Sequence, residues 1–70
     1  MRIEANGASH EIREGTSVKA FVESLNLSPQ WVVCELNGEV VERARLADVV
    51  LKEGDRLEIV RAVAGGQPWN

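Results

Sequence analysis

The sequence has few of the residues that small proteins use for covalent or metal-based stability. Its 70 residues include one cysteine and one histidine. An internal disulfide and a Cys/His zinc site are therefore excluded, and no metal site is expected. A chain this short buries only about 60% of the surface that its unfolded form exposes, so we expect one domain with a thin core.

Long apolar runs, clustered basic residues and tyrosine are also missing. Without a long apolar run we expect no membrane span, and the start MRIEANG shows no signal region, which makes a cytoplasmic location the default. The net charge is −3, and the basic residues are scattered. Nucleic-acid binding usually needs clustered positive charge and stacking aromatics, so no nucleic acid is expected as a partner.

Apolar residues alternate with polar ones in the first part of the chain, with the period of two that is typical of strands. This pattern predicts strands over residues 1–5 and 8–13. Asn6-Gly7 between them is a hairpin signal, because both residues tolerate a positive φ. His10 falls on the more apolar face of the second strand.

One amphipathic helix is predicted over residues 17–25. Its apolar stripe has the spacing i, i+3, i+4, i+7 and consists of Val18, Phe21, Val22 and Leu25. Thr16 or Ser17 is a suitable N-cap, and Asn26 is a plausible C-cap. Pro29 prevents the helix from continuing.

The period of two returns from Trp31. It predicts a strand over 31–37, a second hairpin at Asn37-Gly38 and a short strand over 39–41.

Residues 43–51 are ambiguous, because their helical spacing leaves room for only a turn or two. A turn over 53–55 then leads into a last strand over 56–61, with Leu57 and Ile59 pointing inward. The order of elements predicts a two-layer α+β domain over residues 1–61. Residues 62–70 have no periodicity and are predicted to be a flexible tail.

No set of residues resembles a catalytic site. Nucleophilic catalysis needs a nucleophile, a base and a group that orients the base. Cys34 is expected in the core, where burial makes a thiol unreactive. His10 has no orienting partner, and the acidic residues form no recognisable dyad. The sequence therefore predicts a protein that is not an enzyme and that carries no cofactor.

The outward face of the predicted sheet is a candidate partner-binding surface. Val33 and Val60 point away from the core, with Glu35 and Glu58 beside them. Exposed valines next to carboxylates suit a surface that binds another protein.

The turns, the helix start and the C-terminal glycines together resemble a known family. The matching stretches are Asn6-Gly7 and residues 15–18, 33–41 and 51–66. With Gly65-Gly66 placed after the last strand, they resemble the ubiquitin-like sulfur carriers of the ThiS and MoaD family, and most closely its branch in thiamine biosynthesis. The resemblance implies the β-grasp fold, with one mixed sheet of four to five strands packed on one main helix.

The resemblance also implies a chemistry for Gly66. In such carriers an E1-like adenylating enzyme activates the glycine carboxylate, and a sulfur donor such as a cysteine desulfurase converts it to a thiocarboxylate. Thiazole synthase or another acceptor then takes the sulfur. Gly65 and Gly66 lack a Cβ, which allows a tail to thread into a partner's active site. Because residues 67–70 follow Gly66, a processing protease is implied as well.

Two alternatives stay open. One is a ubiquitin-like interaction module, and the other is a sulfur carrier of another pathway, such as cysteine or molybdopterin synthesis. They differ at Gly66: a carrier gains sulfur there, a tag forms an isopeptide bond to a lysine, and a pure binder does neither.

Overall fold

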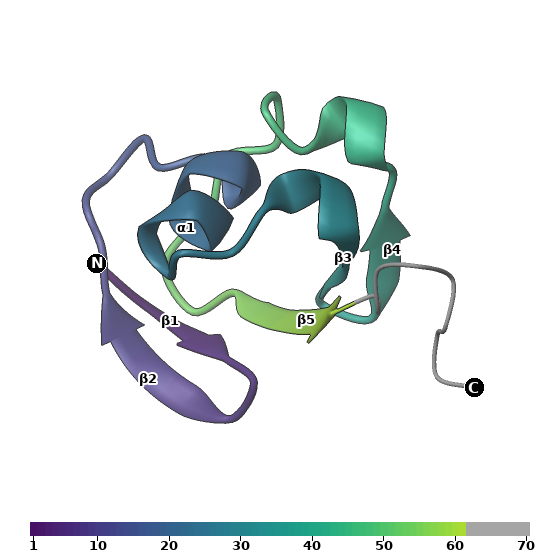
Figure 1. Cartoon of the computed structure of the whole chain (residues 1–70). Helices are drawn as coiled ribbons and strands as arrows, with labels where there is room; N and C mark the ends of the chain where they lie inside the picture. Colours follow the sequence, from purple (N-terminus) through teal and green to yellow (C-terminus); the bar gives the residue numbers. More distant parts are fainter. Residues whose placement is uncertain (62–70) are drawn as a thin grey trace.

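A five-stranded sheet with one α-helix across it makes up the computed structural model, which describes residues 1–61 (Figure 1). The elements are β1 (Arg2–Ala5), β2 (Ala8–Glu11), α1 (Val18–Ser24), the 3₁₀ turn η1 (Pro29–Trp31), β3 (Val32–Leu36), β4 (Glu39–Val41), the 3₁₀ turn η2 (Arg43–Arg45) and β5 (Arg56–Arg61). The predicted order of elements and the α+β class are confirmed.

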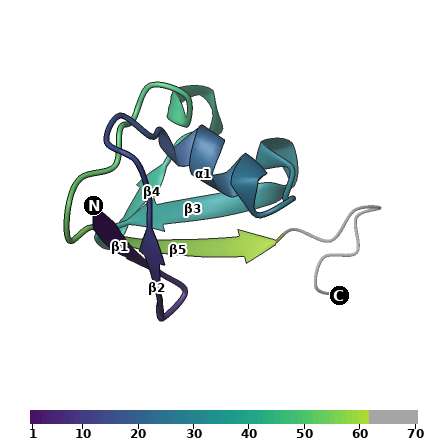
Figure 2. The ribbon, with the colours of Figure 1, turned by 90° about the vertical axis from the view of Figure 1, so that its left-hand side faces the viewer.

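The sheet is mixed, and its last strand lies at its centre. The strand order is β2-β1-β5-β3-β4. β1 and β5 run parallel, and the other pairs are antiparallel. The helix α1 and both 3₁₀ turns lie on one side of the sheet, so no element of residues 1–61 covers the other side (Figure 2).

The core lies between the sheet and α1. Its buried residues are Ile3, Ala5, Val18, Phe21, Val22, Val32, Cys34, Leu46, Leu51, Leu57 and Ile59. In β1, β3 and β5 they are the alternate residues that the period of two predicts, and in α1 they belong to the helical stripe. No helix in residues 1–61 is long and apolar enough to cross a membrane.

The helix is one residue shorter than predicted at each end, and its N-cap is one of the two residues that the sequence offered. The Ser17 hydroxyl accepts the N–H of Ala20 at 3.0 Å, which makes Ser17 the N-cap. The prediction of Asn26 as C-cap is wrong, because Leu25 holds that position. Asn26 follows it in the left-handed region at φ 65°. Its N–H donates to the Glu23 carbonyl at 2.9 Å, which closes the helix end.

Residues 43–51 contain no α-helix, because the carbonyls of this segment serve α1 instead. The Val18 N–H donates to the Val49 carbonyl at 2.9 Å, and the Lys19 N–H donates to the Leu46 carbonyl at 3.0 Å. These are amides of the first turn of α1, which have no partner within the helix. The segment therefore caps a neighbouring helix and buries Leu46.

Three predicted strands are shorter than expected, and β1 begins at Arg2 instead of Met1. Trp31 lies in η1, because Pro29 occupies the first position of this 3₁₀ turn. The strand β3 therefore begins at Val32, one residue later than predicted. The strand β2 ends at Glu11, although the Ile12 N–H still donates to the Met1 carbonyl at 2.8 Å. The pairing thus continues slightly beyond the regular strand.

Candidate functional site

The central strand β5 leads directly into the predicted tail. Residues 62–70, with Gly65 and Gly66, lie outside the described residues, so the flexibility and role of this tail stay predictions. The structure describes the strand that precedes the tail and the outward face of the sheet beside it.

The asparagines of both hairpin turns hold β5 in place. Asn6 Nδ2 donates to the Ile59 carbonyl at 3.1 Å, and Asn6 Oδ1 accepts the Ile59 N–H at 2.7 Å. At the other end of the strand, Asn37 Oδ1 accepts the Arg56 N–H at 2.9 Å, and Asn37 Nδ2 donates to Asp55 Oδ1 at 3.0 Å. The backbone pairing of β1 with β5 stops near Leu57, so Asn6 extends it toward the tail.

Sequence reasoning assigned these two asparagines to turns and missed this bracing role. Asn6 and Asn37 do adopt positive φ, at 50° and 52°, as the turn signal requires. No local pattern reports the second role, because each side chain bonds to β5 across a long sequence separation.

The outward face of β3, β4 and β5 carries the predicted partner-binding residues. Val33 lies directly opposite Val60, and Glu35 lies directly opposite Glu58. The valines are 41% and 54% exposed, and both glutamates are exposed as well. The predicted orientation is confirmed, while the docking role stays a prediction. Sequence reasoning missed Val40, which is 62% exposed and lies opposite Glu35 on β4. The register of the Asn-Gly hairpin is the signal that would have found it.

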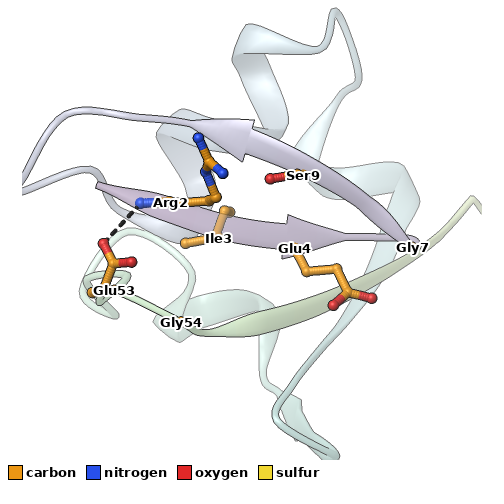
Figure 3. Close-up of a pocket in the computed structure, with 7 residues that line it drawn as sticks. All are labelled: Arg2, Ile3, Glu4, Gly7, Ser9, Glu53 and Gly54. Carbon is orange, nitrogen blue, oxygen red and sulfur yellow. Dashed lines mark hydrogen bonds between the residues drawn. The ribbon is translucent and has the colours of Figure 1, made fainter.

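The other half of this face holds a surface pocket of about 380 Å³ (Figure 3). It is lined by Arg2, Ile3, Glu4, Gly7, Ser9, Glu53 and Gly54. Its arginine is already engaged: Arg2 Nη2 donates to Glu11 Oε2 at 3.3 Å, and the Arg2 backbone N–H donates to Glu53 Oε1 at 2.9 Å. Because the Arg2 guanidinium and the Glu53 carboxylate are already engaged within the protein, we do not assign a ligand to the pocket.

The two candidate nucleophilic and basic side chains are part of the packing. Cys34 is 1% exposed, and burial raises the pKa of its thiol, against a smaller opposing effect of the Arg43 guanidinium. A thiol in this environment stays protonated and unreactive. His10 is half-buried and packs edge-on against the Phe21 ring, with ring centroids 5.2 Å apart. In residues 1–61 no three His, Cys, Asp or Glu side chains lie close enough together to hold a metal ion.

Comparison with known proteins gives one consistent family. The model of the ThiS family matches residues 2–66. A crystal structure of a thiamine biosynthesis protein (ThiS) from Geobacter metallireducens superimposes with a TM-score of 0.79, at 30% identity, and the match covers 94% of this chain and 100% of that chain. A solution structure of a thiamine biosynthesis protein from the same organism has a TM-score of 0.76, at 30% identity, and the match covers 96% of this chain and 90% of that one.

A curated thiazole synthase from Paramagnetospirillum magneticum is also similar. It is 32% identical over 66 residues, which are 94% of this chain and 20% of the relative. The chain therefore spans about a fifth of the length of this relative. The β-grasp fold predicted by resemblance agrees with the fold of the solved ThiS structures.

Proposed function

The chain belongs to the ThiS family, and on that premise we propose that it is a sulfur carrier of thiamine biosynthesis, loaded at Gly66. The observation that carries this proposal is the extent of the family match. It runs through the whole described domain and ends at residue 66, the second glycine of the Gly-Gly pair. The described residues form the sheet and helix from which the strand β5 leads into the Gly-Gly tail, which suits a carrier.

The proposed chemistry takes place at the carboxylate of Gly66. A carboxylate is a poor electrophile until one of its oxygens becomes part of a leaving group. The E1-like adenylating enzyme joins this carboxylate to the AMP moiety of ATP, and pyrophosphate leaves. The terminal sulfur of a persulfide on the donor then attacks the acyl carbon and displaces AMP, which leaves an acyl disulfide between Gly66 and the donor. A thiol reductant supplied with the donor cleaves the S–S bond and releases the Gly66 thiocarboxylate. Glycines at 65 and 66 have no Cβ that would obstruct entry into the active site of the partner.

Residues 67–70 must be removed first, because they hold the Gly66 carbonyl in an amide bond. We assign this step to a processing protease. Pro68 favours an extended conformation at Gln67, and proteases bind extended segments. The Gly66–Gln67 bond is therefore the expected cleavage point.

The proposed docking surface is the outward face that carries Val33, Val60, Glu35 and Glu58. It lies on β3 and on β5, the strand that leads into the tail. A partner seated there would be close to the start of the tail. We assign this partner to the E1-like adenylating enzyme.

The proposed acceptor is thiazole synthase. The support is the curated relative of that name, in which a segment similar to this chain makes up about a fifth of a single polypeptide. A carrier-like segment joined to an acceptor shortens the transfer of sulfur between the two.

Reconstitution tests the proposal. The chain ending at Gly66 is incubated with the adenylating enzyme, ATP and a labelled sulfur donor, and thiazole synthase with its substrates is then added. We expect labelled sulfur in the thiazole product, and none when the chain ends at Gly65. An isopeptide bond from Gly66 to a lysine would favour the ubiquitin-like alternative. Transfer only to a cysteine or molybdopterin acceptor would assign the carrier to another pathway.

A further inference from the structure

Charged residues on the outward face of the sheet are arranged in two different ways. On the β1 side, opposite charges face each other across neighbouring strands: Arg2 lies opposite Glu11, and Glu4 lies opposite Arg56. On the β3 side, two like charges face each other, because Glu35 lies opposite Glu58. Only the second arrangement is unfavourable for the isolated fold, since like charges placed directly opposite destabilise a sheet.

No basic side chain of the described residues forms an ion pair with either carboxylate. The ion pairs found within residues 1–61 join Glu11 to the Met1 ammonium group at 4.0 Å and to Arg2 at 3.3 Å. Neither Glu35 nor Glu58 takes part in one. The two carboxylates therefore lie side by side on an exposed face without an ion-pair partner in residues 1–61. Arg56 lies on the same face of β5, two positions before Glu58, but it faces Glu4.

Exposed apolar side chains surround this pair on three strands. Val40 lies beside Glu35 on β4, and the directly opposed Val33 and Val60 form the next row of β3 and β5. All three valines are more than 40% exposed. An apolar surface with a negative centre is complementary to a partner that presents a cation among apolar side chains.

We propose that the outward face of β3, β4 and β5 binds a partner segment that inserts one arginine between Glu35 and Glu58 and packs apolar side chains on Val33, Val40 and Val60. Side chains opposed across strands have Cβ atoms about 4.5–5.5 Å apart, which brings both carboxylates within reach of one guanidinium. The planar donors of that group can serve two carboxylates at once. This inference rests on the proposed function, because the adenylating enzyme is the partner to which it applies.

Binding to the adenylating enzyme of the same organism tests the arginine site. Affinity is measured by calorimetry at several salt concentrations, with the full chain and with the chain ending at Gly66. We expect Glu35→Gln and Glu58→Gln each to weaken binding about tenfold and to reduce its salt dependence. The double variant should lose less than the product of the two single losses, because one cation contacts both carboxylates. Glu39→Gln is the matched control. It makes the same change of charge at an exposed residue of β4, but Glu39 directly precedes Val40 and therefore points to the opposite side of the sheet.

Glu58→Lys separates binding from folding. It replaces a repulsive cross-strand pair with an attractive one, so the thermal midpoint should rise while binding to the adenylating enzyme weakens by more than tenfold. Loss of binding in this variant would not be explained by loss of the fold.

The outcomes distinguish this inference from the function on which it rests. If the wild-type chain ending at Gly66 is bound and adenylated but the glutamate variants bind within about twofold of Glu39→Gln, the arginine site is refuted and the carrier function stands. Strictly multiplicative losses in the double variant would refute a single shared cation. If the wild-type chain ending at Gly66 is neither bound nor adenylated, the proposed function fails, and this inference fails with it.

Discussion

Replacement of Asn6 by glycine tests whether a turn side chain holds the strand that leads into the tail. Glycine keeps the turn, because it adopts the φ of 50° that Asn6 has here. It removes only the two hydrogen bonds to Ile59, at 3.1 and 2.7 Å. The variant therefore isolates the bracing role of the side chain.

The expected loss follows from these two bonds. Each contributes about 0.5–1.5 kcal/mol, and they leave a half-buried N–H and carbonyl of Ile59 without their partner. Glycine also has more conformational freedom in the unfolded chain, which lowers the free energy of unfolding by up to about 1 kcal/mol more. We expect Asn6→Gly to lower the free energy of unfolding by about 2 kcal/mol, which lowers the thermal midpoint by about 8–16 °C in a domain of this size.

Urea unfolding and amide hydrogen exchange at Ile59 measure this effect. Asn26→Gly is the matched control, because Asn26 also has a positive φ, at 65°, and its side chain makes no hydrogen bond within the described residues. Glycine is favoured at that helix end, so the control should be as stable as wild type. If Asn6→Gly behaves like Asn26→Gly, and exchange at Ile59 is unchanged, the bracing of β5 by Asn6 is refuted.

Three further predictions concern the sheet face and the buried thiol. Val60→Asp should leave the thermal midpoint nearly unchanged, because the side chain is 54% exposed, and should slow adenylation; unchanged kinetics would contradict docking on this face. Cys34→Ala should cost about 1–2 kcal/mol of stability and still form the thiocarboxylate, whereas a folded variant that cannot be loaded would show that the thiol relays sulfur. Because burial raises the pKa of Cys34 in the native state, the unfolded state loses its thiol proton first, and the stability of wild type should fall as pH rises above 9.0. Cys34→Ala should lose less stability than wild type over this alkaline range. An identical loss of stability in both proteins would contradict a raised pKa for the Cys34 thiol.

The fold could largely be predicted from sequence because its signals are local. Alternation placed Ile3, Cys34 and Leu57 inward, and helical spacing did the same for Val18 and Val22. Two Asn-Gly dipeptides fixed both hairpins. The outward orientation of Val33, Val60, Glu35 and Glu58 also followed from the strand period, since residues that alternate with the core residues must point outward.

The features that sequence reasoning left open or missed on the sheet and at the start of α1 depend on long-range contacts. The Lys19 N–H donates to the Leu46 carbonyl, and this contact decides the conformation of residues 43–51, which the sequence left ambiguous. The bonds from Asn6 to Ile59 join the two ends of the described chain. The opposition of Glu35 and Glu58 depends on strand register, which the sequence pattern did not supply.

The intact mass of two chain lengths after loading tests the central claim most directly. One chain ends at Asn70 and the other at Gly66, and each is incubated with the adenylating enzyme, ATP and a sulfur donor. Exchange of one oxygen for sulfur should add about 16 Da to the chain ending at Gly66 and nothing to the chain ending at Asn70. Equal loading of both chains would contradict the assignment of Gly66, and failure of both would contradict the sulfur-carrier function itself.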